Sequence, residues 1–167
     1  MSNNISIIDL SRFLIAYFNS IGEEITPLKL QKLLYYIQAW NLVYLNDSLF
    51  AEEAEAWVNG PVYRKVYDAY KESGSEPLKI NTSVDKNIEN YQSELLSKLN
   101  LNTDQKELLD AVIKKYGLMP TFQLVYLTHS ESPWNIARER FAPFEPSSEK
   151  ITYESMKSYY SKLIEQN

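Results

Sequence analysis

The segment from residue 27 to residue 45 limits the possible folds of this chain more than any other segment. Apolar residues recur along it at helical spacing on two opposite sides. The first side carries Leu30, Leu33, Leu34, Ile37, Asn41 and Tyr44, and the second carries Tyr35, Ala39, Leu42 and Val43. A helix that is apolar nearly all round is normally buried between other elements. We therefore predict a central helix, with Lys29, Gln31, Lys32 and Gln38 on narrow polar seams.

Helical signals dominate the rest of the chain as well. Ser6 suits the start of a first helix, and Gly22 suits its left-handed end. Further helices are expected over 61–72, 85–99, 103–116, 120–128, 132–140 and from 152 onward, with irregular chain over 75–85 and 141–150. A chain of 167 residues is long enough to bury one core. These patterns predict a mainly α, compact single domain spanning residues 1–167.

The helical period is lost between the central helix and residue 61. A short extended arm over 55–58 is followed by Asn59, Gly60 and Pro61, a sequence typical of a turn. We therefore expect at most a small β-hairpin near residues 49–60. The turn is predicted to be a structural corner that holds Trp57 against the central helix.

Charge and cysteine content exclude several classes of function. The net charge is −5, and the basic clusters Arg64-Lys65 and Lys114-Lys115 are each two residues long, so nucleic-acid binding is disfavoured. No cysteine is present, which excludes thiolate zinc sites and cysteine nucleophiles. The first residues lack the pattern of a signal peptide, and no apolar run is long enough to span a bilayer. We expect a soluble, cytoplasmic protein without membrane contact.

Two groups of residues could in principle support catalysis. His129 is the only histidine and lies near Ser130 and Ser132, but this spacing is unusual for a catalytic triad. The acidic residues Glu52, Glu53 and Glu55 could supply acid–base or metal chemistry, although crowded acids beside a turn usually form a solvated surface. The four glycines are scattered, so no phosphate-binding loop is present. We predict no cofactor, no metal and no enzymatic activity.

The aromatic content favours a protein that works by contact. Thirteen tyrosines and three tryptophans are present, and both residue types are frequent in binding hot spots as well as in cores. From these residues alone we expect an all-helical recognition domain.

Two separated motifs resemble a known family. The first runs from Thr26 through the hairpin region, and the second lies near residues 127–134. The matching residues are Thr26, Lys29, Leu30, Lys32, Leu33, Tyr35, Trp57, Gly60, Pro61, Val62, Thr128, His129, Pro133 and Trp134. Together they resemble the Panacea domain, a family that includes SocA-like antitoxins and GepA-like phage-associated proteins.

The resemblance implies an antitoxin that neutralises a co-encoded toxin, in many cases a translation inhibitor, by direct protein–protein binding. One alternative is an adaptor that delivers the toxin to a bacterial protease. A second alternative is an enzyme that uses His129 or the Glu52–Glu55 cluster. We expect the motif residues to be mostly structural. Candidate toxin contacts are Glu52, Glu53, Tyr63 and Tyr67, which are predicted to lie off the core faces.

Overall fold

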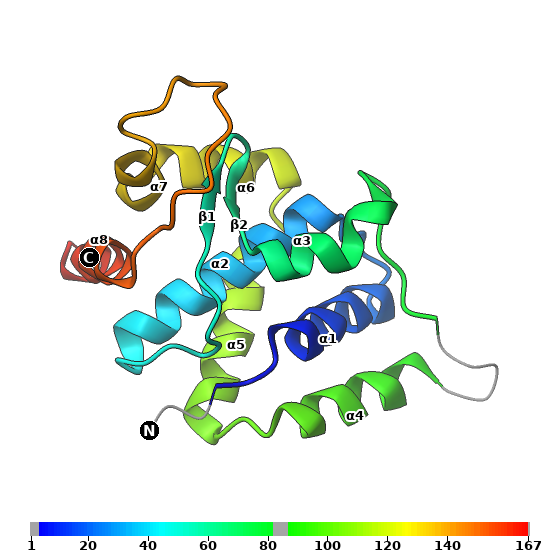
Figure 1. Cartoon of the computed structure of the whole chain (residues 1–167). Helices are drawn as coiled ribbons and strands as arrows, with labels where there is room; N and C mark the ends of the chain where they lie inside the picture. Colours follow the sequence, from blue (N-terminus) through cyan, green and yellow to red (C-terminus); the bar gives the residue numbers. More distant parts are fainter. Residues whose placement is uncertain (1–3, 82–86, 167) are drawn as a thin grey trace.

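The computed structural model describes residues 4–81 and 87–166 of the chain. Within them lie eight α-helices, one short 3-10 helix and one two-stranded hairpin (Figure 1). In chain order these are α1 (Ile7–Ser20), α2 (Pro27–Tyr44), β1 (Glu55–Trp57), β2 (Gly60–Val62), α3 (Arg64–Tyr70), η1 (Lys71–Ser73), α4 (Ile88–Leu99), α5 (Thr103–Tyr116), α6 (Thr121–Ser130), α7 (Ser132–Ala137) and α8 (Tyr153–Glu165). The prediction of a mainly α fold with a small hairpin is confirmed.

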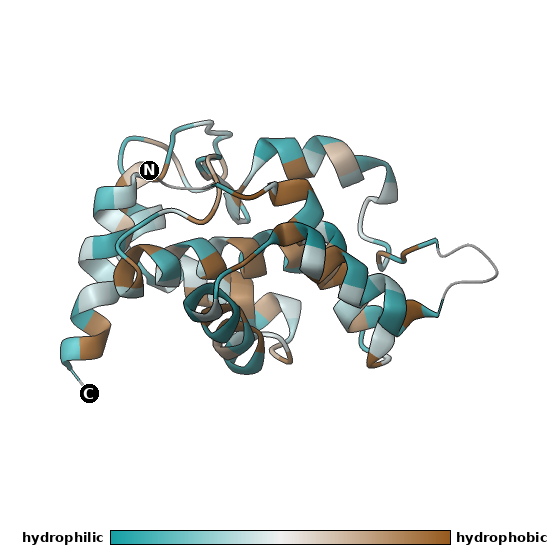
Figure 2. Ribbon diagram, turned by 90° about the horizontal axis from the view of Figure 1, so that it is seen from below, coloured by the Kyte–Doolittle hydropathy of each residue, from teal (hydrophilic) through white to brown (hydrophobic). Residues whose placement is uncertain are grey.

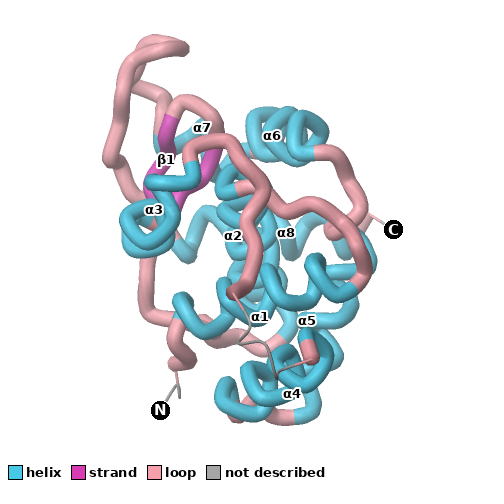
Figure 3. The backbone as a smooth tube through the Cα atoms, turned by 90° about the vertical axis from the view of Figure 1, so that its right-hand side faces the viewer, coloured by secondary structure: helices cyan, strands magenta, loops and turns pink. Residues whose placement is uncertain are grey.

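The helix α2 is the centre of the fold, as predicted. Thr26 caps it by accepting a hydrogen bond from the Lys29 backbone N–H, and Pro27 occupies its first turn. Leu33 and Ile37 are fully buried. The helices α1, α3, α5, α6 and α8 and the strand β2 all pack against α2, which lies in the middle of Figure 3.

The polar seams of α2 do not reach solvent. Gln31 exchanges two hydrogen bonds with the backbone of Tyr63, at 2.8 and 3.2 Å. The Gln38 side chain accepts from the Leu49 N–H at 2.7 Å and donates to the Phe50 carbonyl at 2.8 Å. These side chains are buried because the chain from 49 to 63 lies over them and uses them in place of water.

The hairpin corrects the expected helix over 61–72. Residues Gly60–Val62 pair antiparallel with Glu55–Trp57, so the following helix begins only at Arg64. Gly60 has a φ of +105°, a conformation that favours glycine, which explains why the turn occurs here. Other boundaries also differ, and α6 extends to Ser130 rather than to residue 128. The helix α7 ends at Ala137 rather than at residue 140, and α4 begins at Ile88, while the expected start at Asp85 lies outside the described residues.

The remaining helices cover α2 with amphipathic faces. Brown apolar and teal polar segments alternate along them in Figure 2. The pair α1 and α4 packs closely on one side, and α8 lies beside α2 and α7 on another. Among residues 4–81 and 87–166, no helix combines the length and the apolar character required to cross a bilayer.

Candidate functional site

The two sequence motifs meet at the hairpin. The ammonium group of Lys32 on α2 donates to the Pro61 carbonyl on β2 at 2.9 Å. A Cβ atom at Gly60 would lie 2.8 Å from Lys32 Cε and 2.9 Å from Thr128 Oγ1 of α6. The close approach of α2, β2 and α6 therefore requires glycine at position 60.

The second motif binds the other strand of the hairpin. The Trp134 indole N–H donates to the Trp57 carbonyl at 2.8 Å. The His129 ring stacks on the Trp134 ring at 4.0 Å between centroids and 15° between planes, and His129 also has a hydrogen bond to the Val58 backbone. We call the residues that fix the hairpin in this way the hairpin clamp: Lys32, Gly60, Pro61, Thr128, His129 and Trp134.

Arg138 and the segment 149–151 close the outer edge of β1. The Arg138 guanidinium donates to the Ala56 carbonyl at 2.8 Å and also to the carbonyls of Ala142 and Glu145. The Ala56 N–H donates to the Glu149 carbonyl at 2.8 Å, and the Ile151 N–H donates to the Ala54 carbonyl at the same distance. Local sequence patterns do not reveal this role of Arg138, because nothing nearby in the chain distinguishes a buried arginine from an exposed one.

Burial shifts the pKa values of two residues in the hairpin clamp, Lys32 and His129. Lys32 is fully buried, and this burial lowers its pKa to about 7. Burial, followed by the charge of Lys32, also lowers the pKa of His129. The imidazole therefore favours its neutral form; its ring stacks on Trp134, and its Nε2 is buried without a hydrogen-bond partner.

The acidic residues near the hairpin do not converge on one site. Glu55 is buried, contrary to the expectation of a solvated surface, because Arg64 pairs with both of its oxygens at 3.0 Å. Burial acts to raise the pKa of Glu55, but the hydrogen bonds from Arg64 and Trp57 outweigh it, so the pKa is lowered. Glu52 pairs with Lys65 at 3.3 Å, and Glu53 is exposed. Within the described ranges, no three His, Asp or Glu side chains are grouped as metal ligands would be.

A second buried polar cluster, which no local sequence pattern predicts, surrounds Glu131. Glu131 Oε1 accepts hydrogen bonds from the Tyr36 hydroxyl at 2.6 Å and from the Tyr160 hydroxyl at 2.8 Å. Burial raises the pKa of Glu131 to about 7, although these two hydrogen bonds act to lower it. Because the three partners come from α2, α8 and the α6–α7 junction, only the tertiary structure brings them together.

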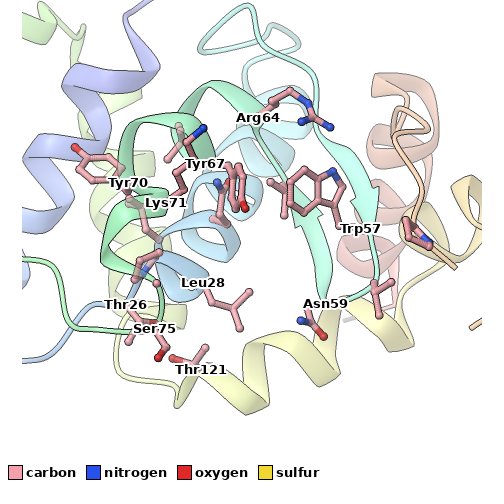
Figure 4. A pocket seen from close by; sticks show the side chains of 18 of the residues that line it. Thr26, Leu28, Trp57, Asn59, Arg64, Tyr67, Tyr70, Lys71, Ser75 and Thr121 are labelled. Atoms are coloured by element: carbon pink, nitrogen blue, oxygen red, sulfur yellow. The ribbon is translucent and has the colours of Figure 1, made fainter. Parts of the chain in front are cut away.

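An open groove of about 930 Å³ lies on the other side of the hairpin (Figure 4). Its walls are the first turns of α2 (26–31), the hairpin turn (57–59) and α3 with η1, and residues 146–148 and Thr121 complete it. Leu28, Trp57 and Tyr67 are labelled around the hollow in Figure 4. The Trp57 ring packs edge-on against the Tyr67 ring at 4.8 Å, and Arg64 lies over it at 5.1 Å. Trp57 thus contacts α3, while α2 faces it across the groove.

The four candidate contact residues have different positions. Tyr67 is 41% exposed and lines the groove, and Glu52 and Glu53 lie before the hairpin. Tyr63 is corrected to a core residue with 1% exposure, because its ring packs against Phe50 and its backbone is held by Gln31. The motif residues Lys29, Tyr35, Val62 and Pro133 are also buried.

A second exposed apolar surface follows α6. Phe122 and Tyr126, four residues apart on α6, are 76% and 73% exposed, and Leu118, which precedes the helix, is 70% exposed. We call these three residues the α6 ridge. Large apolar residues grouped on a surface are a common feature of protein-binding sites.

Two comparisons with known proteins find relatives of this chain, whereas no solved structure gives a significant match. A family model for the SocA-like antitoxin Panacea domain matches residues 30–135, which include most of α2, the hairpin and α6. The antitoxin SocA of Caulobacter vibrioides is 33% identical over 113 residues, which cover 67% of this chain and 59% of that relative. The matched range contains the whole hairpin clamp and most of the groove. On this evidence the chain belongs to the SocA-like antitoxin family, characterised by the Panacea domain.

Proposed function

We propose that this protein is an antitoxin that neutralises a co-encoded, translation-inhibiting protein toxin by direct binding. The observation that carries this proposal is the family match over residues 30–135. The matched relative is named an antitoxin, and the matched segment spans the centre of this fold.

The arrangement of the motif residues supports a role in binding. Lys32, Gly60 and Trp134 hold the hairpin in place, and His129 is stacked on Trp134. A scaffold built in this way leaves its outer surface free to vary with the partner. The net charge of −5 favours fast encounter with a basic toxin, such as one that binds RNA or nucleotides.

We propose further that residues 1–167 form one domain that acts in the cytoplasm. The helices α1 and α8 lie outside the matched range, yet both pack against α2. Ile7, Leu10 and Tyr160 from these helices are fully buried in the same core.

The test begins with the product of the adjacent gene. We expect it to stop growth when it is expressed alone, and we expect co-expression of this protein to restore growth. The two purified proteins should form a stable complex, measured by size-exclusion chromatography and calorimetry. An adjacent product that is harmless alone, or rescue of growth without measurable binding, contradicts the proposal.

The two alternative mechanisms give different results in the same cells. An adaptor shortens the half-life of the toxin, so deletion of the antitoxin gene stabilises the toxin protein. An enzyme loses rescue when His129→Ala or Glu53→Gln is introduced, although binding persists. Direct neutralisation predicts an unchanged toxin half-life and a loss of rescue only when binding is lost.

A further inference from the structure

We propose that α6 and α7 form a unit that opens separately from the rest of the fold, and that the buried carboxyl group of Glu131 holds this unit closed. Ionisation of the carboxyl group weakens the attachment, so the unit opens more often as the pH rises. We call residues 121–137 the α6–α7 unit. The inference concerns this protein alone and does not rest on the proposed function.

The α6–α7 unit is attached to the core by few apolar side chains. Leu124 and Thr128 are the buried residues of α6, and Pro133 is the buried residue of α7. Three further side chains pack against the core while only partly buried: Leu127, Trp134 and Ala137. By comparison, eight residues of α1 and fourteen residues of α2 are buried. Segments with few buried apolar contacts open at a lower free energy than the core, so polar contacts provide much of this attachment.

Glu131 joins the α6–α7 unit to two other helices. It occupies the single position between α6 and α7 and is 4% exposed. Its Oε1 accepts hydrogen bonds from the Tyr36 hydroxyl of α2 at 2.6 Å and from the Tyr160 hydroxyl of α8 at 2.8 Å. The Tyr35 hydroxyl extends this network, since it lies 3.1 Å from the Tyr160 hydroxyl. Movement of the unit away from α2 and α8 breaks both bonds to Glu131 and exposes its carboxyl group to water.

The charge of Glu131 determines how strongly the unit is attached. Burial raises the pKa values of Tyr36 and Tyr160, so their hydroxyls stay neutral and bring no positive charge to the carboxylate. Burial also raises the pKa of Glu131 from 4.5 to about 7. Opening exposes the carboxyl group and returns its pKa to the ordinary value. Ionisation therefore favours the open state progressively as the pH rises from about 4.5 to about 7.

Opening also changes the surroundings of the hairpin. The α6–α7 unit lies beside the hairpin in Figure 1 and carries three residues of the hairpin clamp: Thr128, His129 and Trp134. When the unit moves, the bond from the Trp134 indole to the Trp57 carbonyl is lost. The hairpin is then no longer held by α6 and α7.

Titratable and charged groups surround Glu131 and the α6–α7 unit on every side. They are Lys32, Tyr35 and Tyr36 of α2, Lys115 and Tyr116 of α5, Tyr159 and Tyr160 of α8, and His129 and Arg138 of the chain next to Glu131. Lys115 acts to lower the pKa of Glu131, and its ammonium group lies over the rings of Trp40 and Tyr116 at 5.2 and 5.3 Å. The pKa values of the five tyrosines are all raised above 10, so these hydroxyls do not titrate near neutral pH.

Lys32 and His129 respond to pH in the opposite direction from Glu131. Burial lowers the pKa of Lys32 from 10.5 to about 7, so exposure of Lys32 changes the opening equilibrium only between these two values. Burial, followed by the charge of Lys32, lowers the pKa of His129 below 6.5, so its exposure favours opening at acidic pH. Both groups make opening rarer as the pH rises, whereas Glu131 makes it more frequent. The sign of the response therefore identifies Glu131.

Hydrogen exchange of the full chain between pH 5 and pH 7.5 tests the proposal. Protection factors, which are corrected for the intrinsic exchange rate at each pH, should be lower over residues 121–137 than over α2. Glu131→Gln retains the shape of the side chain and an acceptor oxygen but cannot ionise. The protection of the wild-type unit relative to this variant should fall about tenfold or more from pH 5 to pH 7.5. The matched control is Glu139→Gln, which removes an exposed carboxyl group from the chain just after α7 and should behave like the wild type.

A second variant tests the hydrogen bonds to Glu131 while leaving its carboxyl group in place. Tyr36→Phe keeps the ring that stacks on Tyr116 at 4.1 Å but removes a bond that acts to lower the pKa of Glu131. The pH at which protection of the unit stops falling should therefore move upward, a shift that loss of packing alone does not produce.

Three results overturn the proposal. The first is protection over residues 121–137 equal to that of α2 at every pH, which would mean that the unit opens only with the whole fold. The second is a pH response that Glu131→Gln retains, and the third is a response whose pH range is unchanged in Tyr36→Phe. Each result leaves the proposed function intact, because the measurement contains no toxin.

Discussion

The two sides of the hairpin use similar residue types for opposite purposes. On the clamp side, an indole, an imidazole and an ammonium group are bound to backbone carbonyls or stacked on one another. On the groove side, the Trp57 and Tyr67 rings and the Arg64 and Lys71 cations surround an open hollow (Figure 4). The aromatic and cationic residues of the clamp are used by the fold, whereas the Tyr67 ring of the groove stays 41% exposed, although Arg64 is already paired with Glu55.

Because of this difference, we expect the family motif to be a poor guide to the contact surface. A residue that satisfies a buried carbonyl cannot be changed without leaving that carbonyl unpaired. A residue that faces solvent can change with the partner at little cost to stability. We therefore propose that the motif marks the scaffold and that the contacts lie beside it.

The largest expected effect is on the free energy of unfolding. It compares a core residue of α2 with a residue of the same helix that lines the groove. Leu33→Ala should lower the free energy of unfolding by about 2–5 kcal/mol, because Leu33 is fully buried in the core. Leu28→Ala, one helical turn and a half earlier and only half buried, should lower it by under about 1 kcal/mol. Urea unfolding followed by circular dichroism measures both. Equal losses would mean that the groove lining is as closely packed as the core.

The next effect tests the steric part of the hairpin clamp. Gly60→Ala should cost about 2–4 kcal/mol, because its positive φ adds strain and its new methyl group meets Lys32 and Thr128. Gly22→Ala is the matched control, since Gly22 also has a positive φ (+72°) but nothing lies within 4 Å of its added Cβ. Urea unfolding of the two variants should differ by more than about 1 kcal/mol. Similar losses would reduce the role of Gly60 to backbone conformation alone.

A smaller effect should appear in the pH dependence of stability, which we assign to two buried titratable groups, Glu131 and Lys32. The folded pKa of Glu131 is raised from 4.5 to about 7, so its contribution to stability is complete below about pH 4.5 and is lost as the pH rises to about 7. This loss is on the order of 1–3 kcal/mol. Glu131→Gln should remove it, measured as the difference from wild type in unfolding free energy at pH 5 and at pH 7.5.

Lys32 changes the unfolding free energy with pH in the opposite direction. Its folded pKa is lowered to about 7, so its contribution to stability is present above 10.5 and is lost as the pH falls through about 7. Lys32→Met should flatten the profile between pH 7 and pH 10, while Glu131→Gln leaves that range unchanged. If both variants have the same pH profile of stability as the wild type, then neither group has a pKa that changes on folding.

The smallest effect on stability is expected in the groove. Tyr67→Ala should lower the free energy of unfolding by about 0.5–1 kcal/mol, because it removes mainly the edge-on contact with Trp57. Tyr67 is a candidate toxin contact, so the same variant is expected to weaken toxin binding, and binding and stability then separate at this position. A loss of stability comparable to that of Leu33→Ala would place Tyr67 in the scaffold.

Local sequence patterns were sufficient for most of the elements. The two apolar sides of residues 27–45 predict the buried α2, and the caps at Ser6, Thr26 and Thr152 predict three helix starts that the structure confirms. The turn at Gly60 was also predicted, and its positive φ confirms it. These features depend on neighbours a few residues away, which a sequence displays directly.

The candidate site was only partly predictable. The prediction that Tyr67 lies off the core is confirmed, whereas Tyr63, four residues earlier, proved to be buried. Both lie just after the hairpin, and helical periodicity assigned Tyr63 wrongly because the chain from 60 to 62 is a strand and shifts the start of α3. The family resemblance selected the motif residues, yet it did not indicate whether they face inward or outward.

The sequence by itself determined most of the helices, three of their caps, the central position of α2 and the family. Only the tertiary structure decided that Lys32 and Glu131 are buried, that one face of the hairpin is closed and that the other borders a groove. The physical reason is the range of the interactions. Helix periodicity and capping act over a few residues, whereas the bond from Tyr36 to Glu131 joins positions 95 residues apart and that from Trp134 to Trp57 joins positions 77 apart. Such partners are selected by the packing of whole helices, which no local pattern records.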